Sequence, residues 1–128
     1  MYEITFDEGW LERSKALVQH VEEYFYDEKT KMYFYTSSQD AALIARKMEL
    51  SDNVIPASNS MMARNLLRLG TLYYDQEMIA KSKQMMANMT DDITRTEQPN
   101  FYSNWCQLYA SLVTPPYEIA ILGKEAKL

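Results

Sequence analysis

The sequence predicts an all-α protein with about four main helices, arranged as two consecutive helical hairpin units with a long loop and minor short strands. Apolar residues recur at helical spacing in four segments. Only three glycines and four prolines are present, which disfavours the many turns of a β-sandwich or barrel. A length of 128 residues corresponds to one domain. We therefore expect residues 1–128 to form a single segment.

Charge and composition exclude several classes of partner. The net charge is −5 and no basic stripe is present, so we expect no nucleic-acid partner. No apolar run is long enough to cross a membrane, and the first residues do not resemble a signal peptide. The single cysteine, Cys106, cannot form an internal disulfide, which fits a reducing compartment. These observations predict a cytoplasmic protein.

The first main helix is expected from about Glu8 to Phe25. Thr5 and Glu8 have the spacing of a capping box, and Asp7 is a competing N-cap. Apolar side chains cover one wide face of this helix. They are Trp10, Leu11, Leu17, Val18, Val21, Tyr24 and Phe25.

Residues 26–58 form a long connection. A polar turn at 27–31 precedes the strand-like aromatic run Met32–Thr36, and 41–48 has the composition of a helical turn. The part around Pro56 is expected to be irregular. Long structured loops inside small domains are often functional, so candidate site residues are sought here.

The second and third helices are expected to form an antiparallel hairpin. The second begins at Asn59 or Ser60, either of which is a favourable cap. The third follows almost at once, from about Gln76 to Met89, with Asp75 as its N-cap. Such a short link between the second and third helices forces them to run antiparallel. Their apolar stripes are Met62, Leu66, Leu69 and Tyr73, and Met78, Ser82, Met85 and Met89.

A fourth helix is expected from about Pro99 to Val113. Phe101, Trp105, Leu108 and Leu112 share one face, and the two prolines after Thr114 end the helix. The tail 117–122 reads as a short strand.

The loop and the helix after it carry a recognisable pattern. Its parts are Tyr35–Asp40, Leu43–Glu49, Asp52–Ser60 and Asn65–Leu69. The pattern resembles the C-terminal part of the thioredoxin-domain proteins typified by spermatogenesis-associated protein 20. The opening residues and the run 118–123 are also similar to that family. Two positions depart from it: Ala57-Ser58 replaces the usual Ser-Gly, and Met32-Tyr33 stands where the family has glycines.

The resemblance implies a six-hairpin α/α toroid similar to N-acylglucosamine 2-epimerases and related glycosidases. The family also has a thioredoxin-like domain, but this chain contains no C-x-x-C motif and matches only about the last third of the toroid. We therefore expect a C-terminal fragment that is non-catalytic alone, contributes to a carbohydrate-binding cleft of its parent and needs no cofactor.

The candidate site residues are Arg46, Glu49, Asp52 and Asn59. The first three have the spacing i, i+3, i+6 just before the second helix. Glu49 is the candidate acid/base group, and Arg46, Asp52 and Asn59 are candidates for binding sugar hydroxyls. The alternative is that they hold the loop down through salt bridges and backbone hydrogen bonds. For Asn59 or Ser60 the alternative is helix capping.

The remaining reactive side chains are interpreted structurally. His20 has no partners at metal-ligand spacing, so no metal site is expected. Cys106 and the methionine stripe are expected to pack in the interior. A partial ring would leave apolar helix faces exposed, which predicts a homo-oligomer. The alternative function is a tetratricopeptide-like scaffold for protein interactions, although the loop 26–58 is long for such repeats.

Overall fold

The predicted all-α class is confirmed by a computed structural model that describes residues 1–41, 45–119 and 122–123. Its elements are α1 (Tyr2–Thr5), α2 (Gly9–Phe25), β1 (Tyr26–Asp27), β2 (Met32–Tyr33), α3 (Ser58–Tyr73), α4 (Gln76–Arg95), the 3-10 helix η1 (Pro99–Tyr102) and α5 (Ser103–Val113). None of these helices is long and apolar enough to cross a lipid bilayer.

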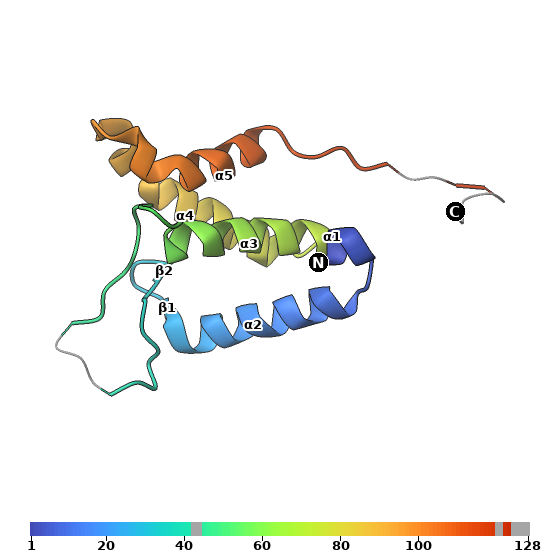
Figure 1. Cartoon of the computed structure of the whole chain (residues 1–128), viewed down its shortest axis with the longest axis horizontal. Coiled ribbons are helices and arrows are strands. Elements are labelled where there is room, and N and C mark those ends of the chain that lie inside the picture. Colours follow the sequence, from blue (N-terminus) through green and yellow to red (C-terminus); the bar gives the residue numbers. More distant parts are fainter. Residues whose placement is uncertain (42–44, 120–121, 124–128) are drawn as a thin grey trace.

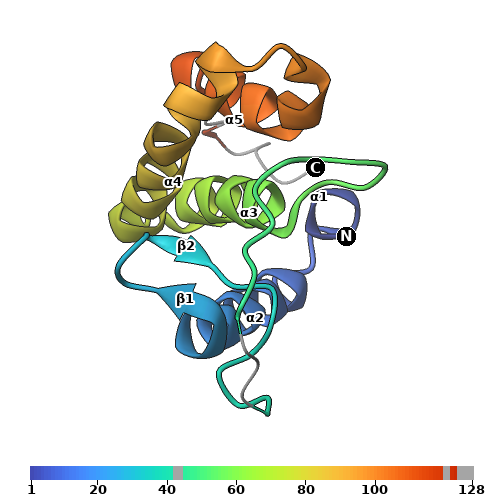
Figure 2. The same ribbon diagram turned by 90° about the vertical axis from the view of Figure 1, so that its left-hand side faces the viewer.

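Helix α3 lies at the centre of the arrangement and contacts α2, α4 and α5 (Figure 1). Helix α2 runs in the direction opposite to α3, and α3 and α5 run in the same direction. Figure 2 shows α2 on one side of α3 and α5 on the other, with the long loop passing one end of the helices. The β1–β2 hairpin lies at that same end.

Helix α2 begins one residue after the predicted start, but the predicted capping box does not form. The competing residue, Asp7, accepts a hydrogen bond from the backbone of Gly9 at 2.9 Å, and the Thr5 hydroxyl accepts one from the backbone of Asp7. Only part of the predicted apolar face is covered. Val18 is buried, whereas Leu17 is 67% exposed, because α3 covers one side of α2 alone.

The β1–β2 hairpin is shorter than the predicted strand Met32–Thr36. Tyr26 pairs with Tyr33 and Asp27 pairs with Met32. The Asp27 carboxylate accepts hydrogen bonds from the backbone and hydroxyl of Thr30, which closes the turn. Of the helical turn expected over 41–48, residues 42–44 lie outside the described residues, and 45–48 are not helical.

Helices α3 and α4 form the predicted antiparallel hairpin. The carboxylate of Asp75 caps α4 by accepting from the backbone of Glu77 and Met78, as predicted. The prediction that Asn59 or Ser60 caps α3 is wrong: the N-cap is Ala57, since both side chains bind groups within the fold. Helix α4 continues beyond Met89 to Arg95 because Ile93 still packs on the core.

The α3–α4 hairpin is closely packed at Gly70. A Cβ atom at this position would lie 2.8 Å from Cγ1 of Ile79 and 3.0 Å from the carbonyl oxygen of Asp75. The backbones of the two helices therefore approach each other at a distance that only glycine allows.

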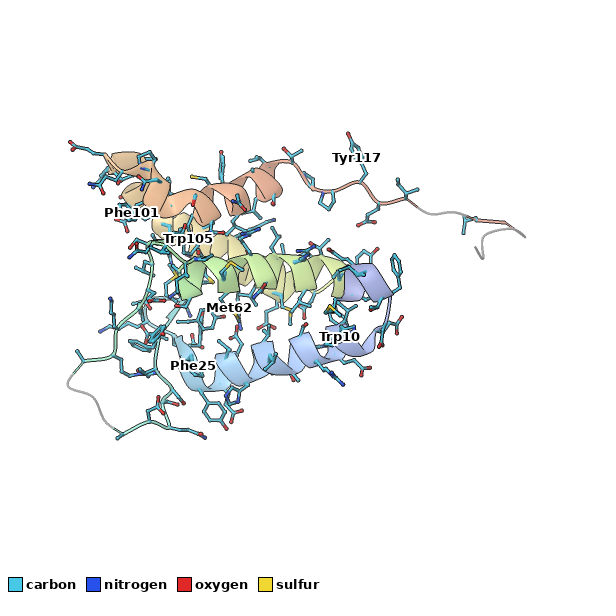
Figure 3. All side chains as sticks on the ribbon, in the orientation of Figure 1. Trp10, Phe25, Met62, Phe101, Trp105 and Tyr117 are labelled. Atoms are coloured by element: carbon cyan, nitrogen blue, oxygen red, sulfur yellow. The ribbon has the colours of Figure 1, made fainter. Side chains whose placement is uncertain are left out.

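The core is rich in methionine and closed by α5. Met85, Met89 and Leu66 are buried, which confirms that the methionine stripe faces inward. Trp105 is fully buried on the side of α5 that faces the other helices (Figure 3), and its indole N–H donates to the carbonyl of Leu50 at 2.6 Å. After α5 the described tail residues 114–119 form no strand, and 120–121 lie outside the described residues.

Candidate functional site

The predicted site residues lie in or beside the loop that crosses the N-terminal ends of α3 and α5. Asp52 is 2% exposed. Its Oδ1 accepts hydrogen bonds from the backbone of Ala57 at 2.9 Å and from the hydroxyl of Ser60 at 2.8 Å. Its Oδ2 accepts one from the backbone of Asn104 in the first turn of α5 at 2.9 Å. One carboxylate thus joins the loop to two helix N-termini, where negative charge is favoured.

Asn59 joins the same loop to the β-hairpin. Its Oδ1 accepts from the backbone of Tyr33 at 2.8 Å, and its Nδ2 donates to the carbonyl oxygens of Tyr33 and Glu49 at 2.8 and 2.9 Å. The side chain is fully buried. An amide is needed here because the site requires an acceptor and two donors in one planar group.

Arg46 holds the middle of the loop against the end of α2. Its Nη2 donates to the carbonyl oxygens of Thr36 and Tyr24, and the guanidinium lies 4.1 Å from the centre of the Phe34 ring. Stacking on an aromatic face and donating to backbone carbonyls are both favourable for a guanidinium. Nε of Arg46 and Oγ1 of Thr36 are buried without a hydrogen-bond partner among the described residues.

Glu49 differs from the other three predicted residues. Glu49 is half-buried as a residue; its backbone carbonyl accepts from Asn59, but its carboxylate makes no hydrogen bond or ion pair within the described part of the chain. Of the two predicted carboxylates, that of Glu49 is therefore the one that accepts no hydrogen bond from the described residues.

The four residues do not converge on one cavity. Asp52 bonds to Ser60, Asn59 bonds to Glu49 only through a backbone carbonyl, and no ion pair joins Arg46 to either carboxylate in the described residues. For Arg46, Asp52 and Asn59, these contacts match the interpretation in which they hold the loop down. Their role in binding a sugar stays a prediction.

A charged network that the sequence did not indicate lies between α2, β2 and α4. The carboxylate of Glu22 accepts from the hydroxyl of Tyr33 and from Nζ of Lys81 at 2.7 Å, and Lys81 also lies 3.4 Å from a carboxylate oxygen of Glu77. Burial, followed by the hydrogen bond and charge of Glu22, raises the pKa of Tyr33 well above its ordinary value. Partial burial opposes the charge on Lys81, but Glu22 and Glu77 raise its pKa overall.

This network was missed for a physical reason. Its members are Glu22, Tyr33 and Lys81, which are far apart in sequence and have no motif spacing. The available signal was the position of Glu22 on the Val18 side of the first helix, where a charged residue needs a partner.

Two surface grooves border α2. One, with a volume of about 370 Å³, lies between α1, α2 and α3 and includes Trp10, Asn65 and Arg68. The other, of about 460 Å³, lies between α2, α3 and α4 and includes Glu22 and Lys81. None of the four predicted site residues lines either groove.

His20 and Cys106 are both on the surface. His20 stacks against Tyr24 with ring centres 4.7 Å apart. Cys106 is exposed, so the prediction that it packs in the interior is wrong, because its side of α5 is uncovered. Among the described residues, no group of three or more His, Cys, Asp or Glu side chains is placed to hold a metal ion.

Comparisons of the chain with protein-family models, curated proteins and solved structures found no match.

Proposed function

We propose that this chain is a non-catalytic, cytoplasmic segment of an α/α toroid, similar to that of the thioredoxin-domain proteins named above. Further helical hairpins of the ring cover its open edges, and its loop end contributes to a carbohydrate-binding cleft. The observation that carries the proposal is the succession of helices, in which α3 and α5 run in the same direction and α4 connects them. Consecutive hairpins of this kind are the units from which helical rings are built.

The two edges of the helical arrangement support the proposal. On the α1–α2 edge, Ile4, Phe6 and Leu17 are largely exposed. On the α5 edge, Tyr109 and Val113 are exposed. Apolar side chains at both edges are expected where neighbouring hairpins of a ring would pack.

The way in which the polar residues are used supports the proposal that the chain alone is non-catalytic. Arg46, Asp52 and Asn59 are engaged by the backbone of the loop. Glu49 is left as a single carboxylate, whereas acid/base work on a glycosidic bond uses a pair of carboxylates. In the proposed ring the second group comes from another hairpin.

One observation favours the alternative of a helical-repeat scaffold. Helices α3 and α4 are joined by Tyr74 and Asp75 alone and pack closely at Gly70, as in tetratricopeptide hairpins. The connection from 26 to 57 counts against it, because such repeats join their helices tightly.

The test starts with the reading frame upstream of Met1. In-frame helical hairpins preceded by a C-x-x-C thioredoxin domain support the ring, whereas tandem repeats of about 34 residues support the scaffold. The chain joined to those hairpins should bind less of an apolar dye and unfold at higher urea than the chain alone. Equal dye binding and equal urea midpoints would refute the ring.

The chemistry is tested in the same longer protein. Glu49→Gln should abolish any sugar epimerase or hydrolase activity that the parent has while leaving its urea midpoint unchanged. Unchanged activity removes Glu49 as the acid/base group.

A further inference from the structure

Helix α5 carries a second apolar stripe beside the buried one. Trp105 and Leu108 face the core. Cys106, Tyr109, Ala110 and Val113 follow the spacing i, i+3, i+4, i+7, so they form a separate stripe on the same helix. We call these four residues the outer stripe.

All four residues of the outer stripe are exposed. Tyr109 is 57% and Val113 is 59% exposed, and Cys106 and Ala110 are also on the surface. Of the polar residues of α5, Ser103 lies in line with Ala110 at the start of the helix, whereas Ser111 lies on the side opposite the stripe. The pattern is therefore that of a helix with two packing faces, of which α3 and α4 cover one.

The charge distribution indicates what covers the other face. Charged residues make up 24% of the chain, and the net charge of −5 makes two copies repel each other. The stretch 98–117, which contains η1 and α5, has no Asp, Glu, Lys, Arg or His. Two copies can therefore meet at α5 without bringing like charges together, and no charged partner is favoured there.

We propose that the outer stripe is a self-association surface, on which α5 of a second copy of this chain packs about a two-fold axis. Tyr109 and Ala110 lie at the middle of the stripe, so both are near the axis. Ala110 allows the two helices to approach closely, and Tyr109 supplies an aromatic contact of the kind enriched in interfaces. The inference applies to this chain alone and does not rest on the proposed ring.

The size of the surface sets the expected affinity. Stable interfaces bury about 1,200 Å² or more in total, and one short helix with four apolar residues falls at the low end. We expect a dissociation constant on the order of micromolar.

Sedimentation equilibrium of the full chain over a range of concentrations tests the proposal. The wild-type chain should shift from monomer to dimer as concentration rises. Ala110→Glu places a charge at the centre of the stripe and should weaken the dimer by roughly 30-fold or more, as for a central interface residue. Ser111→Glu, one residue further on but outside the stripe, should leave the dimer unchanged.

Disulfide cross-linking gives a second measurement that does not depend on a destabilising change. In a Cys106→Ser background, Ala110→Cys should form a covalent dimer on mild oxidation, because its Cβ atoms meet near the axis. Ser111→Cys in the same background should remain monomeric, since Ser111 lies on the side of the helix opposite the stripe.

Three results would overturn the proposal. They are a wild-type chain that stays monomeric to millimolar concentration, equal effects of Ala110→Glu and Ser111→Glu, and cross-linking at Ser111→Cys but not at Ala110→Cys. A different result tests the proposed ring. When the chain is joined to its proposed neighbouring hairpins, the outer stripe should be covered and the chain should no longer form the dimer.

Discussion

Replacing Asp52 by alanine should reveal how strongly one buried carboxylate holds the loop to the helices. The change removes the acceptors for the backbone N–H groups of Ala57 and Asn104. The hydroxyl of Ser60 keeps a second acceptor, the carbonyl of Ala57 at 3.0 Å. Two backbone donors are therefore left unpaired, and each costs about 1–3 kcal/mol in a buried setting.

The expected loss is about 2–6 kcal/mol of unfolding free energy, the sum for the two donors. This is a large part of the roughly 5–15 kcal/mol that stabilises a small domain. Urea denaturation followed by circular dichroism should show the midpoint falling by about 2 M, given a slope of about 1–3 kcal/mol per molar for proteins of this size.

Two further variants separate the carboxylate from general effects of mutation. Asp52→Asn keeps one oxygen but turns an N–H group toward the N–H of Asn104, so an intermediate loss is expected. Asp40→Ala is the matched control: Asp40 is exposed and accepts one hydrogen bond from the backbone of Ser37. It should lose less than about 1 kcal/mol. A loss below about 1 kcal/mol for Asp52→Ala as well would refute the idea that this carboxylate anchors the loop, and would favour a role in ligand binding.

Three other outcomes follow from the contacts described above. The carboxylate introduced by Asn59→Asp cannot donate to the two carbonyl oxygens that accept from the Asn59 amide. Asn59→Asp should therefore lower the unfolding free energy by about 2–4 kcal/mol in urea titrations. The control Asn88→Asp, at an exposed position, should lower it by less than about 1 kcal/mol. Gly70→Ala should lower the thermal midpoint despite alanine's better helix propensity, because the new methyl group meets the backbone of α4; a raised midpoint would contradict the close approach. The pKa of Tyr33 is raised by burial and by Glu22, so the folded state holds this proton more tightly than the unfolded state, whose tyrosine ionises near pH 10. The contribution of Tyr33 to the unfolding free energy should be fully present below about pH 9 and should decrease as pH rises beyond about 10. The urea midpoint of Tyr33→Phe should therefore decrease less than that of the wild type between about pH 8 and 10.5.

Helix positions were predictable from the sequence because their signals are local. Asp75 lies directly before the apolar stripe of the third helix, and a single carboxylate there caps the helix as expected. The stripe that contains Trp105 and Leu108 also identified the buried face of α5. Both features depend only on residues within a few turns of each other.

The position of the loop was not predictable in the same way. Asp52 bonds to a residue of α5 that is 52 positions away, and Trp105 bonds to Leu50 across 55 positions. Spacing along the chain contains no information on such contacts. The sequence therefore identified Asp52 and Asn59 as candidate site residues but could not show which groups they bind.

Exposure of helix faces was the other point at which local reasoning failed. Leu17 lies at a position where the pattern predicts burial, and Cys106 was expected in the interior because free cysteine behaves as a small hydrophobe, but both are on the surface. Periodicity identifies the apolar side of a helix, but the number of neighbouring helices determines how much of that side is covered.

The anchoring by Asp52 and Asn59 makes the two ends of the helical arrangement unequal in rigidity. At the loop end, hydrogen bonds of Asp52 and Asn59 connect α3, α5, the β1–β2 hairpin and the loop. These parts should therefore unfold locally as one unit. At the opposite end, α1 is joined to α3 by the exposed pair of Glu3 and Arg68. Amide hydrogens of α1 should therefore exchange with solvent before those at the helix ends that Asp52 and Asn59 hold together.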